Sequence, residues 1–328
     1  MKRATIGENS SGFVAIIVAV VVTVIISVIT ISFTRIMRRE QRQALDRQLS
    51  TQAFYAAESG ANYAIKSGMA ERSECEQPGD PGYLDAHNAV KFTCLLVNDD
   101  PDELVFDDVN TDEPTIFRIN ENLSEMTIGW QSSTGNTTWP PGGWYTPTPT
   151  FRVASEWGSI VSVVEVVIWP IKSTIDSDDL LTSARTYYLY PSPGGISEEG
   201  TVNYSSDGDI VSGKCHQNKT PKHCQVKIAG MGASGATNGY VVRLRSIYSS
   251  VSLQINGTDV GGQPTELTGA QRVIDVTGRA SDVLRRVQIR LPIRSSYSLP
   301  IFAIETAGDL CKRLDVYPDG ADNSVCSP

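Results

Sequence analysis

The chain has 328 residues, of which 40% are hydrophobic and 20% charged, and its formal net charge at pH 7 is −9. This acidic balance argues against general affinity for nucleic acid or other polyanions. A chain of this length can build one hydrophobic core or two.

The sequence begins with a short basic leader followed by a long apolar run. Residues 13–33 contain no charged side chain, and about 20 residues at a rise of 1.5 Å match the ~30 Å hydrocarbon core of a bilayer. A secretory signal has a shorter apolar region, of about 7 to 15 residues, before a small-residue cleavage site. The run therefore predicts a membrane-spanning helix that stays with the protein.

Two signals disagree on the orientation of this helix. Five arginines lie within residues 35–47, and the positive-inside rule alone would place the C-terminal region in the cytoplasm. Six cysteines at short separations instead suit an oxidising compartment, although they allow 15 connectivities. We take pairing between sequence neighbours as the hypothesis: Cys75 with Cys94, Cys215 with Cys224, and Cys311 with Cys326.

The helical pattern continues beyond the span. Residues 35–67 contain no proline, and small or apolar residues recur at spacings of three and four. These residues are Leu45, Leu49, Ala53, Ala56, Gly60 and Ala64. Such a face predicts a stalk helix that a sheet or another helix can approach closely. Span and stalk together would form one helix of about 55 residues, roughly 80 Å long.

The N-terminal region resembles type IV pilins and pseudopilins in its basic leader, its Gly12-Phe13 junction, its apolar helix and its amphipathic continuation. The segment QAFYAAESGANYAI, residues 52–65, is similar in particular to PilX-type minor pilins. The resemblance covers residues 1–68. It implies that a prepilin peptidase removes residues 1–12, that Phe13 becomes the methylated N-terminus, and that the C-terminal region lies outside the cytoplasm.

One position departs from the family pattern. Most of these pilins carry a glutamate at the fifth mature position, where this chain has Ile17. In the family that carboxylate pairs with the N-terminal ammonium of a neighbouring subunit, and an unpaired buried charge is costly. The resemblance therefore implies a subunit at the tip or cap of a filament.

The rest of the chain has the composition of a β protein. Turns rich in Gly, Pro, Asn and Asp separate segments with strand composition or alternation. The segments are residues 91–97, 115–119, 159–169, 240–247, 272–278 and 284–291. We expect an α+β fold in which the helix of residues 13–68 precedes a β-rich domain at 69–195 and a second β-rich lobe at 196–328. One lobe with a large insertion is the alternative.

Three motifs suggest ligand chemistry without meeting its requirements. Residues 230–235, GMGASG, match a dinucleotide-binding pattern, but a turn and a strand follow where a helix is needed. Residues 215–224, CHQNKTPKHC, offer zinc ligand types at cramped spacing, which favours a disulfide-closed basic turn. The acidic run 99–113 lacks the glycine and the glutamate of a calcium loop and is expected to be solvated loop. We expect no metal and no cofactor.

Two groups of residues are candidates for binding. Arginines alternate with apolar residues in two strand-like segments and would line one sheet face if those strands were neighbours: Arg243, Arg245, Arg286 and Arg290. DNA is one partner for such a face, and pairing with acidic groups of this protein or its neighbours is the favoured alternative. Trp139 and Trp144, in a proline-rich loop, could contact a sugar or a partner subunit, or pack on their own domain.

Catalytic constellations are absent from the sequence. It has three histidines and neither a nucleophile-elbow serine nor an evident carboxylate pair. We expect a non-enzymatic minor pilin that acts at or near the tip of a type IV pilus-like filament, in priming, capping or adhesion. Expected partners are other pilin subunits, a prepilin peptidase, an inner-membrane assembly platform and membrane lipid before assembly.

The expected location is the inner membrane, crossed once with the C-terminal domain outside, and then the extracellular filament. Two alternatives stay open. One is a tip pseudopilin of a type II secretion-like system. The other is a single-span surface receptor or sensor whose anchor is never processed.

Overall fold

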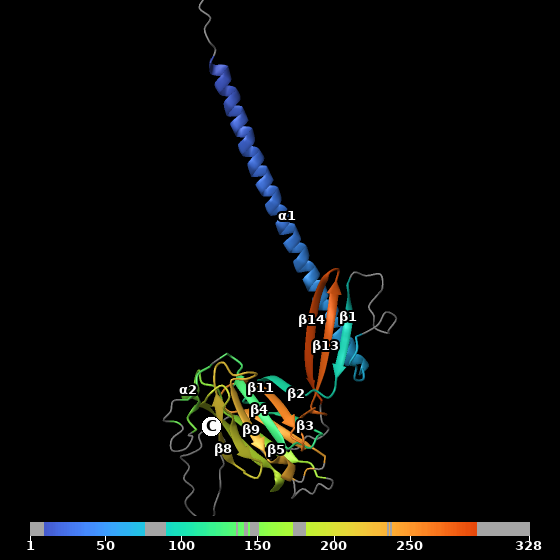
Figure 1. Ribbon diagram of the computed structural model, residues 1–328, viewed down its shortest axis with the longest axis vertical. Coiled ribbons are helices and arrows are strands. Elements are labelled where there is room, and N and C mark those ends of the chain that lie inside the picture. Colours follow the sequence, from blue (N-terminus) through green and yellow to red (C-terminus); the bar gives the residue numbers. More distant parts are fainter. Residues whose placement is uncertain are drawn as a thin grey trace, which may run out of the picture. The chain divides into compact units, whose positions relative to one another are not determined.

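The computed structural model describes residues 10–75, 90–135, 137–140, 144, 151–172, 182–234, 236 and 238–293 (Figure 1). The chain divides into two compact units. The first unit comprises Met1–Leu96 and Asp275–Gln288, and the second comprises Val97–Ile274 and Ile289–Pro328. A long apolar N-terminal helix followed by β-rich structure confirms the expected α+β class.

The first unit contains the helix α1, Ser10–Ser67, which is continuous over 58 residues (Figure 1). Within the described residues it is the one helix that is long and apolar enough to cross a membrane, by length and composition. It ends at Gly68, whose φ is +58°. The backbone N–H of Gly68 donates to the carbonyl of Ile65, and that of Met69 donates to the carbonyl of Ala64 at 3.2 Å. Glycine is favoured here because it adopts this left-handed conformation without a Cβ clash.

The strand residues of the first unit belong to a three-stranded sheet. The strand order is β1 (Val90–Asn98), β13 (Gln271–Ala280) and β14 (Val283–Pro292). Ser281, with φ 55°, lies in the tight turn between β13 and β14. A disulfide joins Cys75, just after α1, to Cys94 in β1. The sheet is therefore covalently linked to the end of the helix.

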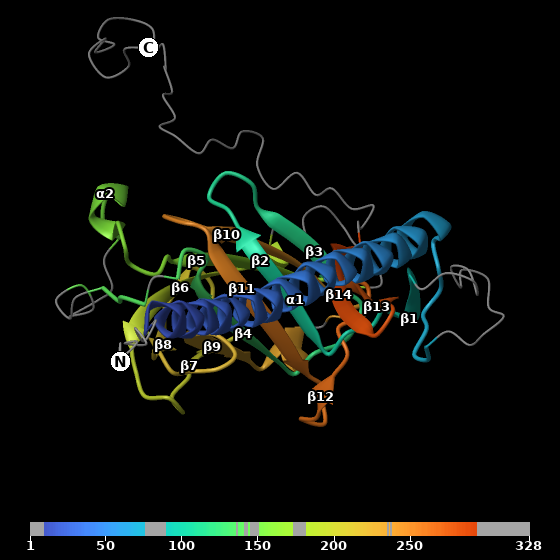
Figure 2. The same ribbon diagram turned by 90° about the horizontal axis from the view of Figure 1, so that it is seen from above.

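The second unit contains an 11-stranded sheet with the path β12-β11-β4-β9-β8-β6-β5-β10-β3, while β2 pairs with β11 and β7 with β9. The strands are β2 (Glu103–Val109), β3 (Thr115–Ile119), β4 (Glu125–Ser132), β5 (Val164–Pro170), β6 (Arg185–Pro193), β7 (Gly200–Asn203), β8 (Asp209–Cys215), β9 (Cys224–Ala229), β10 (Tyr240–Ser246), β11 (Val251–Thr258) and β12 (Pro264–Thr265). The short β12 extends the sheet beside β11 (Figure 2). Two short helical segments, α2 (Ala154–Trp157) and η2 (Met231–Ser234), lie between strands.

The 11-stranded sheet encloses one main core. Strands far apart along its path, including β3 and β11, place side chains in the same buried cluster. Trp130 of β4 is fully buried there, and its Nε1 donates to the carbonyl of Ser162 at 3.0 Å. Gly213 of β8 leaves room for this indole, because a Cβ at that position would overlap the Trp130 ring. The core thus depends on close contacts between strands distant in sequence.

The expected domain boundary after residue 195 differs from the division in the structure. Strand β6 precedes that position and β8 follows it, yet the two pair in parallel from Tyr187↔Asp209 to Pro193↔Cys215. Three glycines and two prolines within residues 190–200 suggest a linker in the sequence, and both prolines lie in β6. They are tolerated because the antiparallel pairing with β5 ends at Leu189, so this part of β6 has a strand partner on one side.

The sequence predicts that the acidic run of residues 99–113 forms solvated loop. The structure contradicts this for the middle of the run. Its middle forms β2, which pairs with β11 and buries Leu104 and Val109 completely. The apolar residues among the acids supply this buried face, while carboxylates occupy the other positions. The expectation was wrong for residues 103–109 because the charge of the run obscured the strand pattern.

Candidate assembly helix and candidate binding residues

The N-terminal part of α1 exposes apolar side chains around its whole circumference. All described side chains of residues 15–37 are exposed, and Ile17, Ile25 and Phe33 retain 48%, 53% and 61% of their accessible surface. A helix that is apolar on every side is normally covered by lipid or by protein. This part of α1 therefore has the surface of an anchor or of a helix-bundle subunit.

The hydroxyl groups in this apolar segment are satisfied within the helix itself. Thr23 Oγ1 donates to the carbonyls of Ala19 and Val20, at 3.0 and 2.8 Å. Further hydroxyls bond the carbonyl four residues earlier at 2.7 to 2.9 Å: those of Ser27, Thr30, Ser32 and Thr34. Because these groups need no water, the segment can enter a bilayer or a protein core without leaving a hydroxyl unpaired.

The C-terminal part of α1 packs closely on the sheet of the first unit. One face of the helix is buried and consists of small residues: Ala53, Ala56, Ala57, Gly60, Ala61 and Ala64. A Cβ built on Gly60 would lie 2.7 Å from Val276 Cγ1 and 3.0 Å from Phe92 Cγ. The sheet approaches the small face that the sequence predicted, although Leu45, counted in that pattern, is 53% exposed.

Two strand residues complete this contact and were not identified from the sequence. Gly278 of β13 lies against the α1 backbone, where a Cβ would overlap the carbonyl oxygen of Ala53. Arg285 of β14 donates from Nε to Ser50 Oγ at 2.8 Å. A glycine inside a strand often marks a close backbone approach, and the segment RVIDVTG of residues 272–278 carried that signal.

The processing residues Gly12 and Phe13 lie in the first turn of α1. The leader residues 1–9 lie outside the described residues. So do Cys311 and Cys326. The other two neighbour pairs are disulfides in the structure, Cys75–Cys94 and Cys215–Cys224.

The segment CHQNKTPKHC forms a β-hairpin closed by its disulfide. Cys215 of β8 faces Cys224 of β9, and the backbone N–H of His216 donates to the carbonyl of His223 at 2.9 Å. Both sulfurs are in the S–S bond, so they cannot serve as thiolate ligands for zinc. Within the described residues no cluster of three or more metal-ligating side chains occurs.

Two lysines of this hairpin are buried. Lys222 donates from Nζ to Ser252 Oγ at 2.6 Å, and Lys219 donates to the backbone carbonyls of Glu198 and Lys214. Burial lowers the pKa of Lys222 and the pKa of Lys219, with nearby carboxylates acting in the opposite direction. Burial, and then the charge of Lys222, also lower the pKa of His223. The hairpin is thus less basic at its surface than its sequence suggests.

The four candidate arginines do not form one binding face. Arg243 and Arg245 lie in β10 of the second unit and both meet Glu165 of the paired strand β5, at 3.9 and 2.9 Å. Arg243 is only 1% exposed. Arg286 lies in β14, in the other sheet, so the two arginine-bearing strands are not neighbours. The sequence predicted a continuous arginine face only if these two strands were neighbours. They lie in different sheets, so this face does not form.

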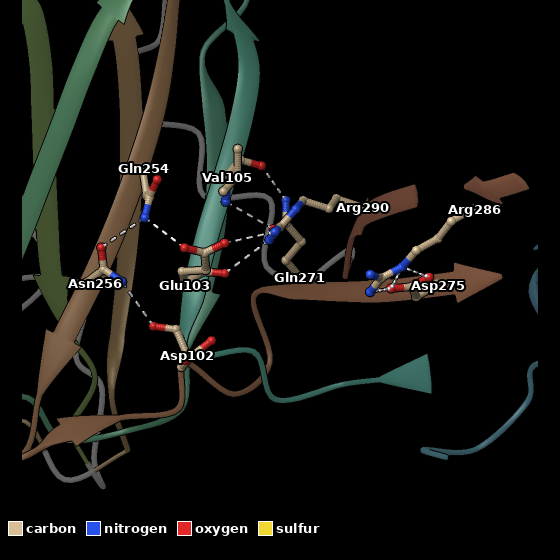
Figure 3. Close-up of polar contacts among 9 residues, drawn as sticks. All are labelled: Asp102, Glu103, Val105, Gln254, Asn256, Gln271, Asp275, Arg286 and Arg290. Carbon is tan, nitrogen blue, oxygen red and sulfur yellow. Dashed lines mark hydrogen bonds and ion pairs between the residues drawn. The ribbon is translucent and has the colours of Figure 1, made fainter. Parts of the chain in front are cut away.

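The arginines of β14 are also paired with carboxylates (Figure 3). In the first unit Arg286 binds Asp275 of β13 through two nitrogens. In the second unit Arg290 donates from Nη2 to Glu103 Oε1 at 2.9 Å, and the other carboxylate oxygen accepts a hydrogen bond from Gln254 at 2.8 Å. All four arginines thus meet carboxylates of their own chain, which was the favoured alternative to DNA.

The two candidate tryptophans pack on their own unit. Trp139 contacts the main core and lies edge-on to His223, with ring centroids 6.4 Å apart. Trp144 packs edge-on against Trp157 in a smaller aromatic cluster, and the guanidinium of Arg152 lies 5.3 Å from its ring centroid. Both indoles therefore have packing partners within their own chain, and both are partly buried.

The motif GMGASG does not form a nucleotide site of the expected kind. Residues 231–234 form the single turn η2, which buries Met231, and β10 follows from Tyr240. No α-helix begins at this motif in the described residues, so no helix N-terminus is available for a pyrophosphate. The loop before a strand that the sequence predicted is what the structure contains.

Comparison with known protein families finds a similarity within α1. The PilX N-terminal family model matches residues 11–62, all of them within the helix. This confirms the expected likeness to PilX-type pilins for the N-terminal region, and it relates that region to minor pilins of type IV pili. The match leaves the sheets of both units uncovered. A search of curated proteins found no match, nor did a search of solved structures.

Proposed function

We propose that the chain is a non-enzymatic minor subunit of a type IV pilus-like filament. The observation that carries the proposal is the two-part character of α1. Its first part is exposed, apolar and internally satisfied in its hydroxyls, while its last part is fixed on a sheet through small residues. The family match at residues 11–62 covers both parts.

In this proposal α1 first anchors the chain in the inner membrane and then joins the helices of other pilin subunits. Burial of apolar surface against those helices replaces burial in lipid. A prepilin peptidase removes residues 1–12, Phe13 becomes the methylated N-terminus, and an assembly platform in the membrane extracts the helix. The β-rich region is displayed outside, where two described disulfides suit an oxidising environment.

The experiment that tests this proposal is mass spectrometry of the N-terminal peptide after coexpression with a prepilin peptidase. A mature chain that begins at Phe13 is expected, with an added methyl group where the peptidase also methylates. The variant Gly12→Val should stay uncut because it alters the residue at the cleavage site. Gly7→Val makes the same change within the leader and should be cut normally. An intact N-terminus, while a known prepilin is cut in the same cells, would support an unprocessed surface receptor.

We further propose a place at the filament tip, where the chain primes assembly, caps the filament or adheres to a surface. The supporting residue is Ile17, an exposed apolar side chain at the fifth mature position. Without a carboxylate there, α1 cannot neutralise the N-terminal ammonium of a subunit packed above it.

Immunogold labelling of assembled filaments tests the position. The wild-type chain should be found at filament ends, and Ile17→Glu should move label along the shaft. Ile16→Glu adds the same charge to the neighbouring position and should not. Label along the shaft for the wild-type chain would contradict the tip position, while the peptidase experiment would still decide whether the chain is a pilin. Whether the filament is a pilus or a secretion pseudopilus follows from the subunits that copurify.

A further inference from the structure

The second unit has a polar cavity with a volume of about 300 Å³. It lies among the end of β5, the start of β6, the turn after β7 and the segment η2. Its described lining contains two cations and no carboxylate. The residues that matter for its chemistry are Lys172, Ser183, Arg185, Asn203, Tyr204 and Ser234.

Arg185 is a lining residue whose hydrogen bonding is incomplete. Its two hydrogen bonds both come from Nη1, to the carbonyls of Thr182 at 3.1 Å and Ala184 at 2.9 Å. Its Nε is buried and has no hydrogen-bond partner. A guanidinium has five N–H donors and matches a carboxylate well. A buried donor without an acceptor is costly and rare, so this one calls for an explanation.

A second unpaired donor lies on the neighbouring wall. Tyr204 is 5% exposed, and its hydroxyl is buried without a hydrogen-bond partner. Burial raises the pKa of Tyr204, so this hydroxyl stays protonated and keeps its proton for donation. Two residues of the cavity lining, one of them charged, therefore each carry a buried donor without a hydrogen-bond partner.

The other polar groups can complement a ligand rich in hydroxyls. Asn203 Oδ1 accepts hydrogen bonds from the backbone N–H and the hydroxyl of Ser205, at 3.0 and 2.9 Å, and this orients its amide. Ser234 Oγ lies 3.0 Å from the hydroxyl of Tyr240. Ligand sites of this size commonly combine a few fixed polar groups with one charged residue.

We propose that this cavity binds a polyhydroxylated carboxylate, such as a uronate unit of an acidic polysaccharide. The carboxylate pairs with the guanidinium of Arg185, and the ligand hydroxyls bond the serine and asparagine side chains. The charge selects acidic ligands, and the hydroxyl-rich lining selects against simple anions. Such a site would let a displayed subunit bind a saccharide. The proposal of this site depends on the second unit alone and not on processing of α1.

The test is isothermal titration calorimetry of the full chain in detergent micelles with three probes. D-glucuronate carries both the charge and the hydroxyls, D-glucose lacks the charge, and acetate lacks the hydroxyls. Glucuronate is expected to bind at least about tenfold more tightly than either of the other probes. Arg185→Gln should weaken glucuronate binding by about tenfold or more.

Two further variants separate a site effect from misfolding or from net charge. Lys227→Gln removes the same charge from the same unit at a residue that does not line the cavity, and it should leave glucuronate binding unchanged within about twofold. Tyr204→Phe removes only the unpaired hydroxyl, so it should weaken binding while the melting temperature holds or rises.

Three outcomes would overturn the proposal. They are no glucuronate binding at about 10 mM, equal binding of acetate, and undiminished glucuronate binding by a folded Arg185→Gln protein. A uronate site could fail in this way while residues 1–12 are still removed by the peptidase, so the outcome is distinct from failure of the pilin proposal.

Discussion

Gly278 of β13 lies directly against the backbone of α1 at Ala53, so that any side chain at this strand position would overlap the Ala53 carbonyl oxygen. Ala57, one turn further along the helix, is completely buried at the same contact. Glycine is required here by the closeness of the two backbones and not by its conformational freedom, because its φ is not in the left-handed region. The contact fixes the last part of α1 on its sheet.

Gly278→Ala is expected to destabilise the first unit by about 2 kcal/mol, because the added methyl group must displace helix backbone rather than a flexible side chain. Calorimetric melting of the full chain in detergent should show a melting temperature lower by about 5–10 °C. Gly232→Ala is the matched control, since the nearest atom to its new Cβ would be 3.9 Å away. An unchanged melting temperature for Gly278→Ala would show that α1 does not pack this closely.

Removal of the disulfide between Cys75 and Cys94 should also destabilise the chain. The two cysteines are separated by 19 residues in the sequence, and closing a loop of that length in the unfolded chain is worth about 3 kcal/mol. The double variant Cys75→Ser/Cys94→Ser should therefore unfold at lower denaturant concentration than the oxidised wild type. The control is to reduce both proteins. If reduction lowers the stability of the variant and of the wild type equally, the stabilisation by disulfides comes from other cysteines.

Glu165→Gln should be the most damaging change among the carboxylates discussed above. It removes the negative charge shared by Arg243 and Arg245, and Arg243 is almost fully buried. Removing one partner of a buried ion pair costs about 3–5 kcal/mol. Chemical denaturation followed by tryptophan fluorescence measures this, since the core of this unit contains Trp130.

Arg286→Gln is the comparison for that variant. It breaks the pair with Asp275, whose side chain is 11% exposed, but the Arg286 side chain is 69% exposed, so water screens this pair more than the pairs of Glu165. Its denaturation midpoint should therefore fall by less than that of Glu165→Gln. Equal losses for Glu165→Gln and Arg286→Gln would contradict the conclusion that burial decides the value of these ion pairs.

Acidification should weaken the disulfide-closed hairpin through His223. Burial lowers the pKa of this imidazole below its usual value of about 6.5, and its Nδ1 is buried without a hydrogen-bond partner. The unfolded chain therefore takes up a proton on this residue at a higher pH than the folded chain does. The contribution of His223 to stability is complete above about pH 7.5 and declines as the pH falls through 6.5.

Melting temperatures measured between about pH 7.5 and 5.5 test this dependence. His223→Gln should flatten the decline, because glutamine does not titrate. His216→Gln, at the other end of the same hairpin turn, should leave the decline in place. A wild-type protein that becomes more stable on acidification over this range would contradict the stated sign.

The N-terminal helix was predictable because its causes are local. An uncharged run of bilayer length and small residues at spacings of three and four act within a few turns of one helix, so residues 13–67 could be assigned without knowing their neighbours. The later course of the chain was less predictable. The acidic residues of ELVFDDV suggest loop, and the prolines and glycines of residues 190–200 suggest a boundary, because neither pattern shows which strand lies beside it.

The sequence by itself determined the apolar span, the small face of the stalk, the β-rich character and the pilin-like N-terminus. Only the tertiary structure decided that Arg243 and Arg245 meet Glu165, while Arg286 meets Asp275 and Arg290 meets Glu103. It alone brought Arg185 and Tyr204 to one polar cavity. The physical reason is that helix patterning depends on neighbours in sequence, whereas strand pairing and burial depend on contacts between distant residues, which a single sequence does not specify.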